Sequence, residues 1–338
     1  MGGPDRRLHQ ARGREPTVAV AFGPIPSRRL GRSLGINNVP PKVCSYGCVY
    51  CQVGATASPQ LEPRAIYPPE ELAAAVGSHV ERVRERGEPI DHLTFVPDGE
   101  PTLDANLALE IELLRPLDIP IAVISNGSLA WRPEVREALR AADCVSVKVD
   151  AVGEAVWRRV NRPHPDLALP TVLEGIRALA NGFPGRLVSE TMLVAGVNDS
   201  AGSVTGVARF LAEIQISLAY VAIPTRPPAE AGVRGPSESV VARAHAILSE
   251  RVPRVEYLVG YEGDAFAASG DPRADLLSIT AVHPLRDSAV RELLERNRSG
   301  WEVVDELVRD GLLVRVEHAG SRFYVRRFHR ARAARGPA

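Results

Sequence analysis

The sequence predicts an α/β fold built on a parallel sheet, followed by a small separate module. From Gly35 onward, six short apolar segments alternate with five segments of helical periodicity. Strands that alternate with helices in this way form βα units around a parallel sheet. From about Arg251 the alternation stops, and helical segments are followed by two apolar stretches around a Gly-containing turn.

Each element follows from its local pattern. The first strand is expected near Gly35–Val39, behind a Gly- and Pro-rich stretch that suggests a short strand or hairpin. The next strands are expected in "HLTFV" (92–96), "PIAVISNGSL" (120–129), "CVSVKVDA" (144–151), "RLVSETMLVAG" (186–196) and "SLAYVAIP" (217–224). The helices between them are expected at 70–87, 105–117, 133–142, 171–183 and 200–215, where apolar residues recur every three or four positions. "EYLVGYEGDAF" is a candidate for one more strand and turn.

Polar or unusual residues follow the carboxyl end of every expected strand. They are Cys44–Cys51, Asp98–Glu100, Ser125–Asn126, Asp150, Asn198–Asp199 and Thr225–Arg226. Taken singly, such residues are often simple turn formers. Because parallel α/β proteins carry their active sites at this edge, six in succession favour a functional site there.

Composition limits the classes of function. The formal net charge is +0, so the chain as a whole has no electrostatic attraction to nucleic acid or acidic membranes. No apolar run approaches the ~20 residues that cross a bilayer, and residues 1–16 form a polar arm without a signal core. We therefore expect a disordered arm at 1–16, no membrane association and a cytoplasmic location. In a reducing cytosol, clustered cysteines point to a metal or to catalysis rather than to disulfides.

Three of the four cysteines lie together as Cys44-x3-Cys48-x2-Cys51. Close thiolates on a short loop can face one soft metal centre. A structural zinc site needs a fourth Cys or His ligand, which the following residues do not offer. A four-iron cluster held by three cysteines would instead keep one iron open for a substrate or cofactor. Cys144 begins an apolar strand and is expected to be a core residue.

This spacing, with the aromatic Tyr50 before the last cysteine, resembles the radical S-adenosylmethionine (SAM) superfamily. The resemblance covers roughly Gly23 to Pro228. It implies a partial (β/α)6 TIM-like barrel, assigned to residues 17–262, with a [4Fe–4S] cluster on Cys44, Cys48 and Cys51. It also implies that SAM chelates the open iron and is cleaved by one electron to methionine and a 5′-deoxyadenosyl radical, which abstracts hydrogen from the substrate.

Other motifs fall where that family binds SAM. "PDGEPTL" looks like the Gly-Gly-Glu motif, with Asp98 in place of the first Gly, Gly99 as the second and Glu100 as the acceptor for the SAM ammonium. The resemblance further implies contacts of Ser125, Asn126 and Asp150 with the ribose and methionine parts. Tyr50 is a candidate for lining the adenine pocket, and the backbone of "SETMLVAGVND" for binding adenine. Lys148 lies two residues before Asp150 on the same strand. It either faces the mouth of the barrel, at the carboxyl ends of the strands, or is an ordinary lysine at a strand edge.

A narrower resemblance lies in "GPIPSRRLGRSLGIN", "DGEPTL" and "IPTRPPAE". Together with the cysteine motif, these stretches resemble a branch of Fe–S oxidoreductases related to the tRNA wyosine-base synthases. The basic or polar residues they contribute are Ser27, Arg28, Arg29, Arg32 and Arg226. They are candidates to neutralise a carboxylate or phosphate at the barrel mouth, the alternative being a solvated basic loop.

Residues 274–330 have the layout of a winged helix, with 331–338 as a tail. Helical stretches are followed by a hairpin around "EHAGSR". The expected recognition helix "WEVVDELVRDG" is acidic, which suits a phosphate-lined groove poorly. We therefore expect this module to position an RNA or protein substrate rather than to read DNA.

Two classes of function remain open from the residues. The favoured one is a radical SAM enzyme with an electron donor such as flavodoxin or ferredoxin and an unidentified substrate, an RNA base being one candidate. The alternative is a nucleic-acid-binding regulator whose Fe–S cluster senses redox state. A sensor needs the cysteines but not Glu100 or the Ser125–Asn126 turn, so these residues favour the enzyme.

Overall fold

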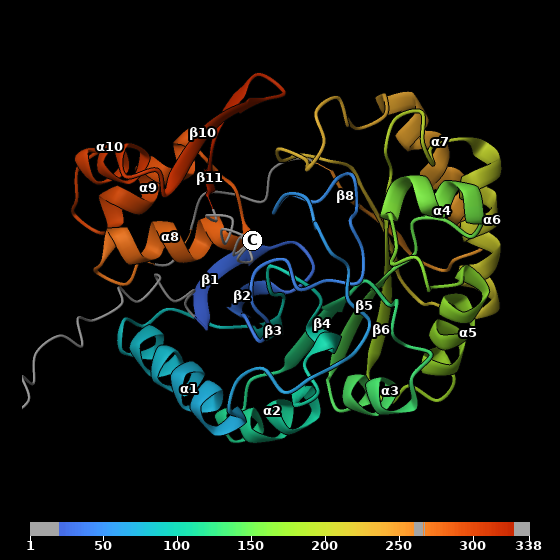
Figure 1. Cartoon of the computed structure of the whole chain (residues 1–338), viewed down its shortest axis with the longest axis horizontal. Coiled ribbons are helices and arrows are strands. Elements are labelled where there is room, and N and C mark those ends of the chain that lie inside the picture. Colours follow the sequence, from blue (N-terminus) through green and yellow to red (C-terminus); the bar gives the residue numbers. More distant parts are fainter. Residues whose placement is uncertain (1–19, 260–265, 267, 328–338) are drawn as a thin grey trace, which may run out of the picture.

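The computed structural model describes residues 20–259, 266 and 268–327, and its main feature is a curled eight-stranded sheet (Figure 1). The strands lie in chain order from β1 to β8, and all neighbours from β2 onward are parallel. They are β1 (Ala21–Ser27), β2 (Gly31–Ile36), β3 (His92–Phe95), β4 (Ile121–Ser125), β5 (Cys144–Lys148), β6 (Arg186–Met192), β7 (Ala219–Ala222) and β8 (Val255–Leu258). The sheet is the partial, open TIM-like barrel that the sequence predicts.

Helices ring the outside of this sheet (Figure 1). They are α1 (Pro69–Glu85), α2 (Leu107–Leu114), α3 (Pro133–Arg140), α4 (Glu154–Asn161), α5 (Leu169–Ala180), α6 (Ala201–Glu213) and α7 (Glu238–Ser249). Each carries an apolar face, such as Leu72, Val76, Val80 and Val83 on α1, which is buried against the strands. All four residues of β7 are buried, as expected for a strand covered on both sides.

Several elements differ in extent from the sequence prediction. The first parallel strand runs over Gly31–Ile36 rather than near Gly35–Val39, because it pairs with β1 as an antiparallel hairpin that starts at the Ser27–Gly31 turn. The sheet also continues past the sixth expected strand through α7 and β8, and α4 is a helix that the pattern did not single out. The turn expected after β8 lies outside the described residues, as do the 1–16 arm and the 331–338 tail.

A smaller unit follows the barrel. It contains α8 (Pro272–Val282), β9 (Leu285–Arg286), α9 (Asp287–Arg296), α10 (Glu302–Arg309), β10 (Leu313–His318) and β11 (Ser321–Arg326). The strands form an antiparallel sheet in the order β10-β11-β9. Helices followed by a hairpin are what the sequence predicts here, and a winged-helix domain over 274–330 stays a prediction.

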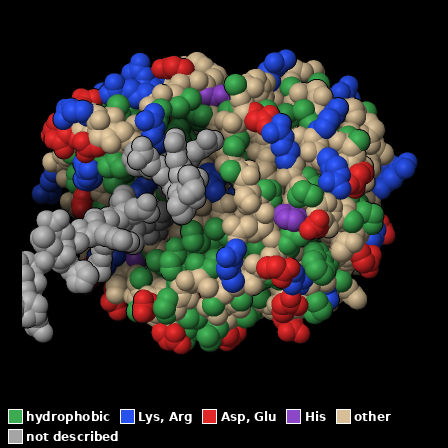
Figure 2. All heavy atoms as spheres, viewed as in Figure 1, with side chains coloured by type: hydrophobic (Ala, Val, Ile, Leu, Met, Phe, Trp, Pro, Cys, Tyr) green, Lys and Arg blue, Asp and Glu red, His purple; other side chains and the backbone are tan. Residues whose placement is uncertain are grey.

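This smaller unit packs beside β1, at the edge of the barrel sheet (Figure 1). Ile25 of β1 contacts its apolar core, and Arg296 of α9 lies 3.5 Å from Glu88 of the barrel. Acidic and basic side chains are interspersed over the face in Figure 2, in keeping with the balanced net charge. Within the described ranges, no helix combines the length and apolar character needed to cross a membrane.

Candidate functional site

The three clustered cysteines lie in the loop between β2 and α1 and line one cavity of about 250 Å³. Each of the three is half-buried. The cavity is also lined by Arg28, Arg29, Lys42, Tyr50, Gln52, Val53, Thr56, Val96–Glu100, Ile124–Asn126, Lys148, Glu190, Met192, Ala222–Arg226 and Leu258. Residues that follow β2, β3, β4 and β7 therefore meet at one edge of the sheet, as the sequence predicts.

Backbone hydrogen bonds fix the cysteine loop against α4. The N–H of Gly47 donates to the carbonyl of Asn161 at 3.0 Å, and the N–H of Val49 donates to that of Val160 at 3.0 Å. The indole of Trp157 donates to the Tyr46 hydroxyl at 3.1 Å. The loop is thus held by a helix more than a hundred residues further along the chain.

The donor set of this loop fits a metal cluster. Burial raises the pKa of Cys44 and Cys51, and it raises that of Cys48 to about 12. Buried neighbouring thiols ionise readily only when a cation takes up their charge. Among the described residues, no three Cys, His, Asp or Glu side chains lie close enough together to bind a single metal ion. The three thiols nevertheless line one cavity, so they suit a larger metal cluster better than a single ion.

Gly99 brings the loop after β3 into backbone contact with the cysteine loop. A Cβ built on Gly99 would lie 2.2 Å from the carbonyl oxygen of Val43, closer than real Cβ atoms come to other atoms. The neighbouring N–H of Glu100 donates to the same oxygen at 2.8 Å, and the N–H of Lys42 donates to the carbonyl of Asp98 at 2.7 Å. Only glycine allows this approach.

Glu100 contacts two other residues that the sequence predicts for the site, Ser125 and Asn126, and also Thr102. Its carboxylate accepts hydrogen bonds from the Ser125 hydroxyl, the Asn126 N–H and the Thr102 hydroxyl, each at 2.7 Å. Burial raises the pKa of Glu100, and these donors oppose the rise. Glu100, Ser125 and Asn126 thus form one connected group on the cavity wall.

Asp98, which replaces the first Gly of the expected motif, forms a buried ion pair. Its carboxylate lies 3.3 Å from the Lys42 ammonium, and its side chain is 1% exposed. Burial raises the pKa of Asp98 to about 7, although Lys42 lowers it. The departure from the motif therefore adds a carboxylate that matches a lysine two residues before Cys44.

Asp150 lies behind the cavity rather than in its wall. Its carboxylate accepts hydrogen bonds from the Tyr50 hydroxyl, from the Asn161 amide at 2.7 Å and from the Met192 N–H at 2.8 Å. Tyr50 itself lines the cavity. Asp150 thereby ties the cysteine loop to β6, and a direct contact with a ligand stays a prediction.

Glu190 is a cavity residue that the sequence analysis missed. It lies on β6, where the resemblance implied only backbone contacts, and its carboxylate pairs with Arg29 and Lys148. Burial alone would raise the pKa of Glu190, but the two cations outweigh it and lower the pKa to about 2. The local sequence of β6 gave no signal for this role, because the partners of Glu190 come from β5 and the β1–β2 turn.

The other basic candidates divide into two groups. Arg28 and Arg226 line the cavity, where Arg28 donates to the carbonyl of Val259 at 2.5 Å and Arg226 to the Gln52 side chain at 2.7 Å. Arg32 instead pairs with Glu88 at 2.8 Å and, like Ser27, Asn198 and Asp199, is absent from the cavity wall. Cys144 is buried in β5, as the sequence predicts for a core residue.

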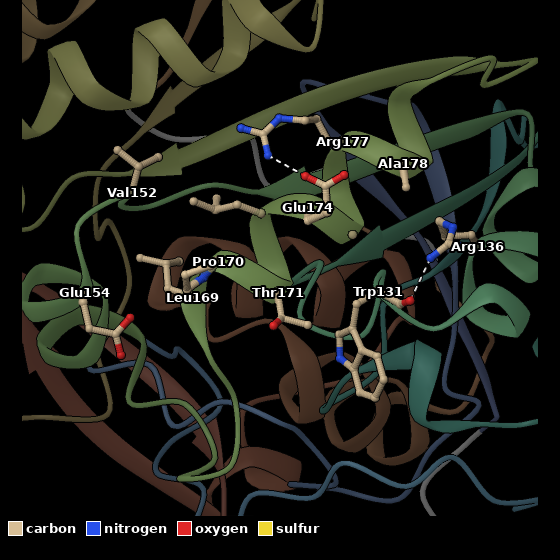
Figure 3. Close-up of a pocket in the computed structure, with 12 residues that line it drawn as sticks. Trp131, Arg136, Val152, Glu154, Leu169, Pro170, Thr171, Glu174, Arg177 and Ala178 are labelled. Atoms are coloured by element: carbon tan, nitrogen blue, oxygen red, sulfur yellow. Dashed lines mark hydrogen bonds and ion pairs between the residues drawn. The ribbon is translucent and has the colours of Figure 1, made fainter.

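A larger, open groove of about 990 Å³ lies on the outer surface around α5 (Figure 3). It is lined by Trp131, Arg136, Val152, Glu154, Leu169–Thr171, Leu173–Gly175, Arg177 and Ala178. Arg177 pairs with Glu174 at 2.9 Å, and Arg136 donates to the Trp131 carbonyl at 2.8 Å (Figure 3). The cysteines take no part in it, so we assign the candidate site to the smaller cavity.

Comparison with known proteins identifies a matching family and a relative that aligns over nearly the whole chain. The profile of the family described as "Radical SAM superfamily" matches residues 38–202. A protein of Methanocaldococcus jannaschii described as "UPF0026 protein MJ1312" is 42% identical over 91% of this chain and 96% of its own length. That alignment spans 311 residues, so it extends beyond the barrel into the smaller unit.

Two solved structures are similar to part of this chain. A radical SAM methyltransferase from Sphaerobacter thermophilus is 21% identical, with a TM-score of 0.47 over 68% of this chain and 67% of that one. A structure of TYW1 with a lysine-pyruvate adduct bound is 16% identical, with a TM-score of 0.48 over 65% of this chain and 74% of that one.

Proposed function

The chain belongs to the radical SAM superfamily, and from that premise we propose that it holds a [4Fe–4S] cluster on Cys44, Cys48 and Cys51 and cleaves SAM. It is thus an enzyme of that superfamily. When bound, the cluster and SAM supply a one-electron reductive cleavage that yields methionine and a 5′-deoxyadenosyl radical, which takes hydrogen from the substrate. The observation that carries this proposal is the single cavity shared by the three thiols and the Glu100 group.

Each part of the cavity wall has a separate task in this proposal. Cys44, Cys48 and Cys51 would hold the cluster, and three ligands for four irons would leave one iron open to the SAM amino acid group. Glu100 accepts from the SAM ammonium while its protein donors hold it in place. Gly99 permits the close approach that sets Glu100 beside the cysteines, and Tyr50, which lines the cavity, would contact the adenine part of SAM.

The substrate and its route of entry are further proposals. An RNA base or a protein side chain would reach the cavity past the smaller unit, and a flavodoxin- or ferredoxin-type protein would supply the electron. Arginines of that unit pair with its own acids, as in Arg273–Asp310 at 3.0 Å and Arg322–Glu317 at 3.1 Å. Such pairing reduces its attraction for phosphate, so a positioning role is favoured over strong nucleic-acid binding.

Anaerobic reconstitution with iron and sulfide, followed by SAM and a strong reductant, tests the proposal. We expect wild-type protein to form 5′-deoxyadenosine, and Cys48→Ala to lose the product by at least about a hundredfold because one of three ligands is missing. Cys144→Ala is the matched control and should retain the activity, because Cys144 is buried in β5 away from the cavity. A fully loaded wild-type protein that forms no 5′-deoxyadenosine would refute the proposal, including the choice of an enzyme over a redox sensor.

A further inference from the structure

Two buried asparagines each divide their amide hydrogens between a cysteine sulfur and an oxygen. Asn161 donates to the Cys48 sulfur at 3.5 Å and to the Asp150 carboxylate at 2.7 Å. Asn126 donates to the Cys44 sulfur at 3.6 Å and to the Ser45 hydroxyl at 2.9 Å. Since a side-chain amide has two N–H groups, both donors of each asparagine are used.

Neighbouring groups fix the orientation of both amides. The Asn126 side-chain oxygen accepts from the N–H of Ser128 at 2.8 Å, so its NH2 group must face the sulfur. The Asp150 carboxylate that orients Asn161 is itself held by the Met192 N–H and the Tyr50 hydroxyl. Asn161 is 2% exposed and Asn126 is 8% exposed, so water competes little for these donors.

The third cysteine has a different environment. The Lys42 ammonium, paired with Asp98 at 3.3 Å, lines the same cavity as Cys51. Cys44 and Cys48 thus meet neutral amide donors, whereas Cys51 is near a cation. The three sulfurs are therefore unequal before any ligand binds.

We propose that Asn161 and Asn126 are positioning residues that raise the reduction potential of the cluster by donating N–H bonds to the Cys48 and Cys44 thiolates. Reduction adds negative charge that is shared by the sulfurs, so these bonds are stronger in the reduced state. The inference rests on the proposed function, because it requires the cluster to be bound by these cysteines. It assigns to Asn161, at the end of α4, a role that no motif indicates.

The test is a potentiometric titration of the reconstituted full-length protein, followed by EPR, without SAM. Asn161→Leu keeps most of the side-chain volume and removes the donor. We expect its cluster to be harder to reduce, by up to about tenfold in the equilibrium constant, which is about 59 mV for one electron. Asn198→Leu is the control, since Asn198 is also buried but donates to the backbone carbonyls of Asp150 and Met192 instead.

The outcomes separate the inference from the proposed function. A wild type that binds no iron refutes the proposed function. A loaded Asn161→Leu protein with the wild-type potential, or an equal shift in Asn198→Leu, overturns the inference alone.

If Asn161→Leu does not load, pulsed EPR of reduced wild-type protein labelled with 15N-asparagine replaces the titration. A nitrogen coupling that changes with the label supports the inference, and its absence overturns it.

Discussion

At the residue scale, the cavity places opposite charges in pairs before any ligand is present. Glu190 lies between Arg29 and Lys148, and Asp98 lies against Lys42. Buried charges of this kind persist only where a partner offsets their loss of water. Glu190 with Arg29 and Lys148 therefore offers ionised groups at fixed positions, which is the arrangement that stabilises a charged cofactor without reorganisation.

Two buried acidic residues, Asp104 and Glu110, lie on the segment that follows Glu100. Burial raises the pKa of Glu110, and the Asp104 carboxylate raises it further. Folded Glu110 therefore keeps a proton that the unfolded chain releases above about pH 4.5. The contribution of Glu110 to the free energy of unfolding therefore falls as pH rises from about 5 to about 8.

We expect Glu110→Gln to remove this loss, because the amide can replace the protonated carboxyl as a donor to Asp104. The variant should gain on the wild type by up to about 1.4 kcal/mol per pH unit as pH rises. Thermal melting of both proteins at about pH 5, 6.5 and 8 measures this difference in stability. A difference in the free energy of unfolding that stays constant over this range would contradict a proton kept on Glu110 in the folded state. Glu110→Ala is the control that shows the cost of removing the hydrogen-bond donor to Asp104.

At the element scale, the loops after β2 and β3 act as one unit because Gly99 lets their backbones meet. Replacing Gly99 by Ala forces a Cβ against the Val43 carbonyl. We expect Gly99→Ala to cost about 1–3 kcal/mol and to reduce the iron bound per chain, because the cysteine loop must shift.

Melting temperature and iron content check this prediction, with Gly77→Ala as the control. Gly77 lies inside α1, and a Cβ there meets no atom within 4 Å. The control should raise stability by about 0.5–1 kcal/mol and leave iron binding intact. Equal behaviour of the two alanine variants would show that the contact with Val43 is unimportant.

The sequence predicted those parts of the site that lie within local motifs. Cys44, Cys48, Cys51 and the Glu100 group follow strand ends, so strand order alone brings them together. Asn161 and Glu190 could not be predicted in this way, because their roles depend on partners from other elements. The same limit applies to Asp98, because its ion pair with Lys42 could not be predicted from the local sequence.

At the scale of the whole molecule, alternating apolar and helical segments were enough to predict a parallel sheet, and the family resemblance implied its curling into a partial barrel. The pattern also suggested a short strand or hairpin where β1 lies and one more strand where β8 lies, but it did not single out the helices α4 and α7. It also could not show that the smaller unit packs on β1 through Ile25, since that contact joins surfaces far apart in the chain. That packing sets the smaller unit beside the barrel.

The central claim is that three cysteines hold a cluster whose fourth iron accepts SAM. EPR spectra of the reduced, reconstituted protein with and without SAM test it most directly. We predict that SAM shifts the g-values of the cluster, that adenosine, which lacks the amino acid group, does not, and that Cys48→Ala gives no such signal. A loaded wild-type cluster whose spectrum is the same with and without SAM would contradict the account.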